Sequence, residues 1–468
     1  MNALFLGGFL AAMTAGIPIA LAMCIGSLLY IWLSGNIPPL TVVHRMVGGI
    51  DSFPLLAVPF FILAGNLMNS AGITNRIFDF AIALVGWLKG GLGHVNVVGS
   101  VVFSGMSGTA VADAGGLGTI EIKAMRDHGY PTEFAVGITA ASSTLGPIIP
   151  PSLPLVIYGV QANTSIGKLF AGGFIPGALL AIFMMAMVTY YAHVRKYGAD
   201  VAFSWGRMGR ALLELGTTLA VAAVLYTLWQ NESLGSFYKF GLPLIGVLIL
   251  DRLLRLEAFM ALMTPVILIG GMMSGLFTPT EAAVAAVAWA LFLGFVWYRT
   301  LTPRMFAKIT FDTIETTAAV LFIVASASIF AWVLTTTQMT EAIAQWVLGF
   351  TDNKWVFLVM ANVFLLFVGC FMETIAAITI LVPVMIPIVN HLGIDPVHFG
   401  LVMVLNLMIG LLTPPVGMVI FILSKISKLS FEETVRAIMP WMIPLLATLA
   451  VITFVPETVL WLPRLLYP

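Results

Sequence analysis

The sequence has very little charge for its length. Only 9% of its 468 residues are Asp, Glu, Lys or Arg, whereas about 25% is usual for a soluble domain. Hydrophobic residues make up 60% of the chain, and the mean hydropathy is +1.05. These values exclude an ordinary soluble protein and predict a multi-pass membrane protein. The 21 basic residues balance the 21 acidic ones, so the charge gives no reason to expect a nucleic-acid partner.

Cysteine is scarce as well. The two cysteines, Cys24 and Cys370, both lie in apolar segments, where a free cysteine behaves as a small hydrophobic residue. We therefore expect neither a disulfide nor a thiolate metal site. No Lys or Arg precedes Arg45, so the first apolar stretch lacks the basic flank of a signal peptide and is expected to remain as a helix.

The apolar stretches predict a series of membrane helices. Two of them, 91–127 and 354–391, break at polar tips over 104–109 and 369–374, a pattern typical of re-entrant hairpins. Two shorter amphipathic stretches, 74–90 and 338–350, are expected to lie along the membrane interface. The remaining candidates are 3–33, 53–70, 131–160, 167–192, 210–229, 240–256, 258–275, 280–298, 314–336, 396–424 and 437–462.

The most specific pattern is a repeat. Gly146-Pro-Ile-Ile-Pro-Pro151 returns 264 residues later as Gly410-Leu-Leu-Thr-Pro-Pro415, and the same offset relates Gly105 to Gly369. Gly and a Pro pair interrupt a helix, so 131–160 and 396–424 are expected to be broken helices. Helices broken at matching positions of two halves point to the binding site of a secondary transporter.

Basic residues predict the orientation. Lys89, Lys123 and Arg126 lie at the base of the first hairpin, whereas the base of the second has no basic excess. By the positive-inside rule the first hairpin enters from the cytoplasm and the second from outside, so the two halves are inverted. The scheme places the His44–Arg45 pair outside, where it fits least well.

The tips and breaks carry neutral oxygens. Unwound backbone exposes carbonyl groups, and half-helix ends carry partial charges that suit ions. Hydroxyl and amide oxygens are hard ligands that suit an alkali cation rather than zinc or copper. The alternative is that small residues simply permit close helix packing. The residues are Ser104, Ser107 and Thr109 in the first tip, Ser142, Ser143 and Thr144 before the first break, Glu373 and Thr374 in the second tip, and Asn406 and Thr413 around the second break.

Two acidic residues lie in apolar sequence. Asp113 follows the first tip, and an acid inside a membrane is a functional candidate because its burial is costly. A helix cap, or a pair with Lys123 or Arg126, is the alternative for Asp113. Glu281 stands three residues after Thr278, the spacing of a helix capping box, and is expected to be structural.

Four stretches resemble the large membrane subunit of tripartite ATP-independent periplasmic (TRAP) transporters, the DctM-like M subunit. They are Phe103-Ser-Gly-Met-Ser-Gly-Thr-Ala-Val-Ala-Asp113, Ala141-Ser-Ser-Thr-Leu-Gly-Pro-Ile-Ile-Pro-Pro151, Leu276-Phe-Thr-Pro-Thr-Glu-Ala-Ala283 and Asn406-Leu-Met-Ile-Gly-Leu-Leu-Thr-Pro-Pro-Val-Gly417. The chain departs from many relatives at 372–375, which reads Met-Glu-Thr-Ile instead of Met-Asp-Pro-Thr, and in the insertion at 210–256.

The resemblance implies an all-α, inverted-repeat elevator fold of the ion-transporter superfamily, with two re-entrant hairpins and two discontinuous helices. It implies five parts: scaffold helices and arm of the first repeat (1–90), the first half of the transport domain (91–192), a linker with two extra helices (193–257), scaffold helices and arm of the second repeat (258–350), and the second half of the transport domain (351–468).

The resemblance also implies a function. Such a subunit would lie in the bacterial inner membrane and take up a small organic acid by Na⁺ symport, with no enzymatic activity and no cofactor besides the coupling ion. Its partners would be a small four-helix membrane subunit and a periplasmic substrate-binding protein. Carried over to this chain, one Na⁺ site falls at Ser104, Gly105, Ser107, Ser143 and Gly146, the other at Gly369, Glu373, Gly410 and Thr413, and the substrate lies near Ser107, Thr109, Asp113, Pro150, Thr374, Asn406 and Pro414.

Other functions remain open from the sequence. A stand-alone Na⁺-coupled carboxylate carrier of the same superfamily would have nearly the same fold. An ATP-driven permease subunit would carry its nucleotide site on another chain. A more remote alternative is an intramembrane serine protease, because residues 105–108 match a short GxSG motif and His391 or His398 would be its base.

Overall fold

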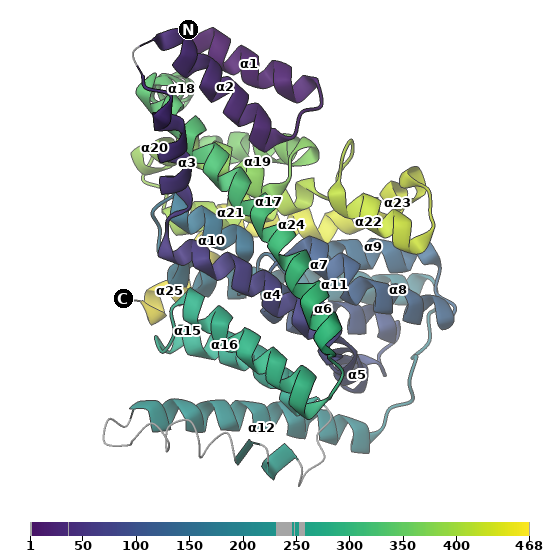
Figure 1. Ribbon diagram of the computed structural model, residues 1–468. Coiled ribbons are helices and arrows are strands. Elements are labelled where there is room, and N and C mark those ends of the chain that lie inside the picture. The colour runs from purple at the N-terminus through teal and green to yellow at the C-terminus, as the bar shows by residue number, and fades with distance from the viewer. Residues whose placement is uncertain (1, 36, 231–245, 248, 252–257, 468) are drawn as a thin grey trace.

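The computed structural model describes residues 2–35, 37–230, 246–247, 249–251 and 258–467. This part of the chain is helical, and eight of its helices are long and apolar enough to span a membrane. The prediction of an all-α multi-pass membrane protein is therefore confirmed. Figure 1 shows α17 (Pro303–Thr336) crossing the molecule diagonally, with α12 (Trp205–Gln230) along the opposite edge from α1 and α2.

The first apolar stretch, 3–33, was expected to be one span, and this is wrong. It forms two helices, α1 (Asn2–Thr14) and α2 (Ile19–Ser34), which pack against each other. Gly16 between them has φ +78°, and Pro18 precedes α2. A left-handed glycine followed by proline turns the chain back, and a hydropathy count does not register such a turn.

The rest of the first half follows the predicted order. The short helix α3 (Leu40–Ile50) was not predicted, because its 11 residues mix apolar side chains with His44 and Arg45. The other helices are α4 (Ala57–Ser70), the arm α5 (Ile73–Val85), the hairpin α6 (Gly91–Ser107), α7 (Ala110–Gly115) and α8 (Leu117–Asp127), the broken helix α9 (Thr132–Ser143) and α10 (Leu153–Gln161), and the last helix α11 (Ile166–Val194).

The second half repeats this order after α14 (Phe259–Pro265), the π-helical segment η3 (Val266–Gly270) and α15 (Gly271–Met273). It continues with α16 (Pro279–Leu291), α17, the arm α18 (Met339–Leu348), the hairpin α19 (Lys354–Phe371) and α20 (Thr374–His391), the broken helix α21 (Pro396–Gly410) and α22 (Met418–Ser427), and then α23 (Phe431–Ile438), α24 (Met442–Phe454) and α25 (Glu457–Leu466). The predicted span 437–462 is divided, because Pro456 separates α24 from α25.

Local sequence explains where α16 begins. The Thr278 hydroxyl accepts a hydrogen bond from the Glu281 backbone N–H, and the Glu281 carboxylate accepts one from the Thr278 N–H at 2.8 Å. These reciprocal bonds form a capping box, which satisfies N–H groups that lack partners at a helix start. The structural interpretation of Glu281 is therefore confirmed.

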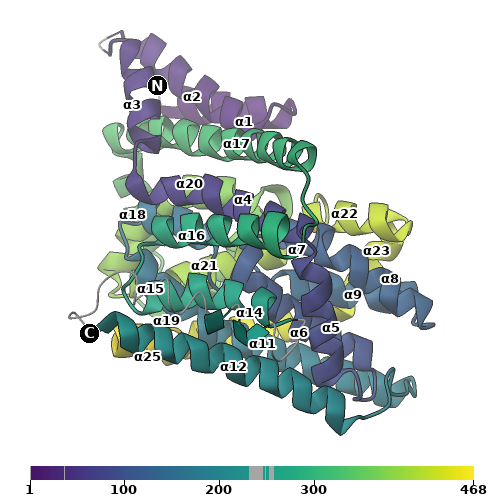
Figure 2. The same cartoon turned by 60° about the horizontal axis from the view of Figure 1, so that its bottom comes forward.

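The helices form two layers of different character. In one group, α2, α3 and α4 pack against α17, and α16 packs against α4. Figure 2 shows α17 lying between the α1–α2 pair and the rest of the molecule. The other group centres on the two broken helices. Every residue of α21 from Val397 to Gly410 is buried, as is every residue of α9 from Phe134 to Ser143. Non-helical backbone at membrane depth is tolerated only inside protein, and this burial provides that setting.

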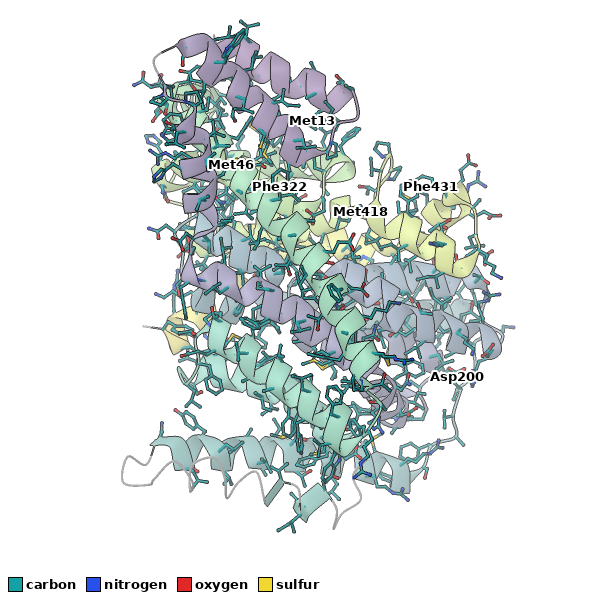
Figure 3. All side chains as sticks on the ribbon, in the orientation of Figure 1. Met13, Met46, Asp200, Phe322, Met418 and Phe431 are labelled. Atoms are coloured by element: carbon teal, nitrogen blue, oxygen red, sulfur yellow. The ribbon has the colours of Figure 1, made fainter. Side chains whose placement is uncertain are left out.

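The segment after α11 returns to the base of the first hairpin. Asp200, labelled in Figure 3, accepts hydrogen bonds from the Leu92 backbone N–H at 2.7 Å and from the Tyr130 hydroxyl at 2.6 Å. Burial and the neighbouring Asp200 raise the pKa of Tyr130, so the phenol stays protonated and remains a donor. The segment then leads into α12, which corresponds to the first of the two extra helices that the sequence predicts. Most of the second, expected at 240–256, lies outside the described residues.

Removing the Tyr130 hydroxyl is expected to loosen this base. Tyr130→Phe deletes one hydrogen bond to a carboxylate and should lower the free energy of unfolding by about 1–2 kcal/mol. The thermal unfolding midpoint of the purified protein measures the effect. Tyr190→Phe is the matched control, because Tyr190 is 61% exposed. Equal midpoints for the two variants would show that the Tyr130–Asp200 bond contributes nothing.

Candidate functional site

The tip of the first hairpin lies directly on the first break. Gly108 ends α6 with φ +65°, and its carbonyl accepts a hydrogen bond from the Leu153 N–H at 3.2 Å. A Cβ added at Gly108 would lie 2.8 Å from the Pro151 carbonyl oxygen. Both the backbone angle and the close approach therefore require glycine. Thr109 then starts α7 by accepting a hydrogen bond from the Ala112 N–H at 3.2 Å.

Asp113 and Gly146 meet beneath this contact. Asp113 is only 2% exposed, and a Cβ added at Gly146 would lie 2.6 Å from its Oδ2 and 3.3 Å from the Thr109 carbonyl oxygen. The missing side chain of Gly146 thus makes room for the carboxylate. Three residues predicted for the site, Thr109, Asp113 and Gly146, are brought together here.

Ser104 of the first hairpin and Ser143 before the first break are both buried. Ser104 and Ser143 each donate a hydrogen bond within their own helix, to the carbonyls of Val101 (2.6 Å) and Ala140 (2.8 Å). A hydroxyl that donates its proton keeps lone pairs for a cation. Ser107 is the last residue of α6, and its side chain lies outside the described part of the structure.

Gly105 lies against a different element. A Cβ at Gly105 would lie 2.9 Å from Pro265 Cβ, at the end of α14, and 3.6 Å from Ile269 Cδ1 in η3. The α carbon of Gly105 therefore faces the helix before α16 rather than the first break. π-Helical segments such as η3 are frequent at functional sites.

The second tip and the second break are in still closer contact. A Cβ added at Gly410 would lie 2.5 Å from the Gly369 Cα. The Val416 N–H donates to the Cys370 carbonyl at 3.2 Å, and the Cys370 thiol lies 2.9 Å from the Thr413 hydroxyl. Both cysteines are free. Cys370 makes a polar contact with the second break through its thiol, in addition to packing as a small hydrophobic residue.

The acid of the second tip serves as a helix cap. The Glu373 carboxylate accepts hydrogen bonds from the N–H groups of Ile375 (2.9 Å) and Ala376 (3.2 Å) at the start of α20. Thr374 beside it is 1% exposed, and its hydroxyl has no hydrogen-bond partner among the described residues. The Thr413 hydroxyl donates to the Gly410 carbonyl at 2.8 Å.

Asn406 belongs to a buried network that the sequence analysis missed. Its amide donates to Asn362 Oδ1 at 2.6 Å, and the Asn362 amide donates to the Thr453 hydroxyl at 3.0 Å. Asn406 Oδ1 is buried without a hydrogen-bond partner in the described chain. Asn362 and Thr453 are polar residues inside apolar helices, a sequence signal that could have predicted this network.

The two breaks differ in exposure. Each contains a cis Pro–Pro bond, at Pro150–Pro151 and at Pro414–Pro415. Pro150 is buried, whereas Pro414 and Pro415 are exposed. The second break is therefore open on one side and the first is closed.

The half-helices that follow the tips and breaks differ in their caps. The Thr109, Ser152 and Glu373 side chains cap α7, α10 and α20, whereas Gly417 in the N-cap position of α22 provides no side-chain cap. Its first N–H groups therefore lack that partner, and a helix N-terminus attracts anions. This uncapped end follows the exposed second break directly.

The two halves meet through these half-helices. Helix α7 of the first hairpin packs against α22 of the second half, and α20 of the second hairpin packs against α10 of the first. The exchange is reciprocal, as an inverted repeat requires. It places both tips and both breaks around one centre, which matches the predicted fold class.

The geometry gives the protease alternative no support. In His398, Nε2 lies 2.7 Å from the Ile452 carbonyl oxygen, so this ring nitrogen is engaged with backbone and not with a serine. His391 ends α20, at the far end of that helix from the second tip.

A solved transporter has the same fold. The crystal structure of the Alcanivorax borkumensis YdaH transporter aligns with a TM-score of 0.56 over 88% of this chain and 86% of that one, at 16% sequence identity.

Several curated relatives are named as TRAP transporter permease proteins. The sialic acid TRAP transporter large permease protein SiaM of Vibrio cholerae is 43% identical over 458 residues, covering 98% of this chain and 97% of that protein. The 2,3-diketo-L-gulonate TRAP transporter large permease protein YiaN of Escherichia coli is 34% identical with the same coverage. The isethionate TRAP transporter permease protein DctMQ of Oleidesulfovibrio alaskensis is 35% identical over 96% of this chain and 64% of its own length.

One family model covers nearly the whole sequence. The model described as "Tripartite ATP-independent periplasmic transporter, DctM component" matches residues 6–458, which include both hairpins and both breaks. The chain therefore belongs to the DctM family of TRAP transporter large permease proteins.

Proposed function

We propose that this chain carries a small organic acid across the inner membrane in symport with Na⁺. The observation that supports this most is the packing of a hydroxyl-bearing tip on a broken helix in each half. Unwound carbonyls and hydroxyls of this kind suit Na⁺. One Na⁺ is held by Ser104, Gly105, Ser107, Ser143 and Gly146, and the other by Gly369, Glu373, Gly410 and Thr413.

The substrate carboxylate is proposed to bind at the uncapped start of α22. This end carries the partial positive charge of a helix N-terminus, and the exposed Pro414 leads to it. The other helix starts around the centre are already capped. The remainder of the substrate lies between the tips, near Ser107, Thr109, Asp113, Pro150, Thr374 and Asn406.

Transport is proposed to follow an elevator mechanism. The two transport-domain halves, 91–192 and 351–468, move as one body against scaffold parts 1–90 and 258–350, with 193–257 as the linker. The contact of Gly105 with Pro265 and Ile269 supports this, because a glycine surface at that boundary has no side chain to obstruct sliding.

The relatives suggest the substrate class and the partners. Sialic acid, 2,3-diketo-L-gulonate and isethionate, named in the relatives, are all small organic acids. The DctMQ relative extends well beyond the region that this chain matches, which supports a separate small membrane subunit for this chain. A periplasmic binding protein is the third proposed component and delivers the substrate.

Uptake in sealed vesicles tests this proposal. The chain is reconstituted with its small subunit, and uptake of labelled sialic acid is followed with the binding protein outside. We expect uptake that requires an inward Na⁺ gradient and ignores ATP. Uptake that persists without Na⁺ would refute Na⁺ symport. Equal uptake without the binding protein would favour the stand-alone carrier.

The hydroxyls of the tip and the break are expected to set the Na⁺ response. Ser107→Ala and Thr413→Ala should each raise the Na⁺ concentration for half-maximal uptake about tenfold, equivalent to roughly 1.4 kcal/mol of binding free energy. Folding should change little. Thr448→Ala is the matched control, because the Thr448 hydroxyl bonds only its own helix, at the Pro444 carbonyl. An unchanged Na⁺ response in both site variants would count against these ligands.

A further inference from the structure

A second buried polar cluster lies in the first hairpin, closer to its base than the tip. The Asn96 amide on α6 donates to Glu121 Oε2 on α8 at 2.6 Å and to the Thr139 hydroxyl on α9 at 2.8 Å. Glu121 and Thr139 are each 1% exposed, and Asn96 is fully buried. Thr139 precedes Ser143 by four residues on α9, which is about 6 Å along a helix. The cluster is thus separate from the tip.

Two acceptor oxygens in this cluster have no partner. Glu121 Oε1 and Asn96 Oδ1 are buried and make no hydrogen bond to any described residue. Glu121 Oε1 lies against α6 at Gly99, 3.3 Å from the position of a Cβ added there. A buried acceptor without a partner costs about 1–3 kcal/mol. Two such oxygens in one cluster indicate a binding site for a ligand.

The charge of the cluster calls for a cation. No basic side chain forms an ion pair with Glu121 within the described part of the chain. The nearest basic residues in the sequence, Lys123 and Arg126, are both exposed. Asp113, the other buried acid of this hairpin, has the same sign. A buried carboxylate remains ionised only when a positive charge accompanies it, and otherwise it takes up a proton.

The second half provides an internal comparison. Its buried network joins Asn362, Asn406 and Thr453 and contains amides and a hydroxyl but no carboxylate. The first half thus holds a charge that its repeat lacks, although both networks tie the hairpin to the broken helix. Packing alone does not require Glu121.

We propose that Asn96, Glu121 and Thr139 form an additional Na⁺ site, separate from the two at the tips. This inference rests on the proposed Na⁺ symport. A cation bound between Glu121 Oε1 and Asn96 Oδ1 would give both unpartnered oxygens a ligand. Carboxylate, amide and hydroxyl oxygens are the hard ligands that Na⁺ prefers. The ion would move with the transport domain and add one Na⁺ to each transport cycle.

Sodium binding at equilibrium tests the site without relying on transport. The full chain, purified with its small subunit, is titrated with radioactive Na⁺ at constant ionic strength, with choline as the replacement cation. We expect Glu121→Gln to bind one Na⁺ fewer per chain than the unmodified protein. Thr139→Val, which removes one oxygen at nearly constant volume, should weaken that Na⁺ at least tenfold. Glu281→Gln is the control, because an amide keeps the capping box intact.

The outcomes separate the two proposals. An unmodified protein that binds no Na⁺ would overturn the proposed Na⁺ symport. Na⁺ binding that is the same in the unmodified protein, Glu121→Gln and Thr139→Val would overturn only the additional site. An unchanged Na⁺ count with altered pH dependence of uptake in Glu121→Gln would assign a proton to Glu121 and also overturn it. If Glu121→Gln fails to fold, Thr139→Val decides the result.

Discussion

Gly410→Ala is expected to abolish uptake while leaving a folded protein in the membrane. The added methyl would lie 2.5 Å from the Gly369 Cα and 2.6 Å from its carbonyl carbon. Both atoms belong to backbone, which does not turn away as a flexible side chain does. The second tip must therefore separate from the second break. That movement breaks the Val416–Cys370 backbone bond and the Cys370–Thr413 contact.

The loss should fall mainly on transport. Overpacking of this kind costs roughly 1–3 kcal/mol, which is small beside a typical stability of about 5–15 kcal/mol. The proposed second Na⁺ site and the start of α22 both lie at the contact, so uptake should fall at least about a hundredfold, equivalent to roughly 2.7 kcal/mol. Initial uptake rates, normalised to protein in the vesicle, measure this.

Two glycine variants complete the test. Gly369→Ala places its methyl 3.0 Å from the Gly410 Cα and should cause a smaller loss. Gly115→Ala is the neutral control, because no atom lies within 4 Å of its added methyl. Full uptake by Gly410→Ala would mean that the close tip-to-break contact is unnecessary for transport.

Asp113→Asn is expected to remove Na⁺-driven uptake almost as completely. The substitution keeps the volume and removes one negative charge from a side chain that is 2% exposed and lies against Gly146. At low dielectric a charge a few ångströms from a cation contributes several kcal/mol, so a drop of about a hundredfold or more in uptake at low Na⁺ is expected. Raising the Na⁺ concentration should restore part of it.

Partial rescue by Na⁺ separates this role from a structural one. A residue needed only for folding would lower the thermal midpoint and the uptake together, at every Na⁺ concentration. Glu433→Gln is the matched control, because its carboxylate closes a capping box with Ser430 that an amide also closes. Gly146→Ala approaches from the other side: its methyl would displace the carboxylate and should reproduce the effect. Uptake by Asp113→Asn that matches the unmodified protein would remove Asp113 from the site.

Features encoded by neighbouring residues could be predicted from the sequence. The span 53–70 and the cap at Glu281 appear in the structure where expected, because hydropathy and capping depend on residues within a few positions. The hairpins and broken helices were also predictable, because Gly and Pro act on their own backbone. The prediction of a single span at 3–33 was wrong, because the sequence stays apolar through the turn at Gly16.

Contacts between distant segments could not be predicted in this way. The thiol of Cys370 meets Thr413, 43 residues away, and Asn96 meets Glu121 and Thr139 on two other helices. The sequence analysis did not single out Glu121, whose neighbours Lys123 and Arg126 are both exposed. Only the packing of α6, α8 and α9 reveals that the acid is buried.

By itself, the sequence determined that this chain is a helical membrane protein with an inverted repeat broken at Gly146–Pro151 and Gly410–Pro415, because hydropathy and backbone interruption are local properties. The tertiary structure decided what each break touches: Asp113 against Gly146, Gly369 against Gly410, and α7 and α20 against the half-helices of the opposite repeat. These contacts depend on how the two halves fold around one centre. Burial and hydrogen bonding across that centre join residues that are distant in the sequence, so local sequence patterns do not predict them.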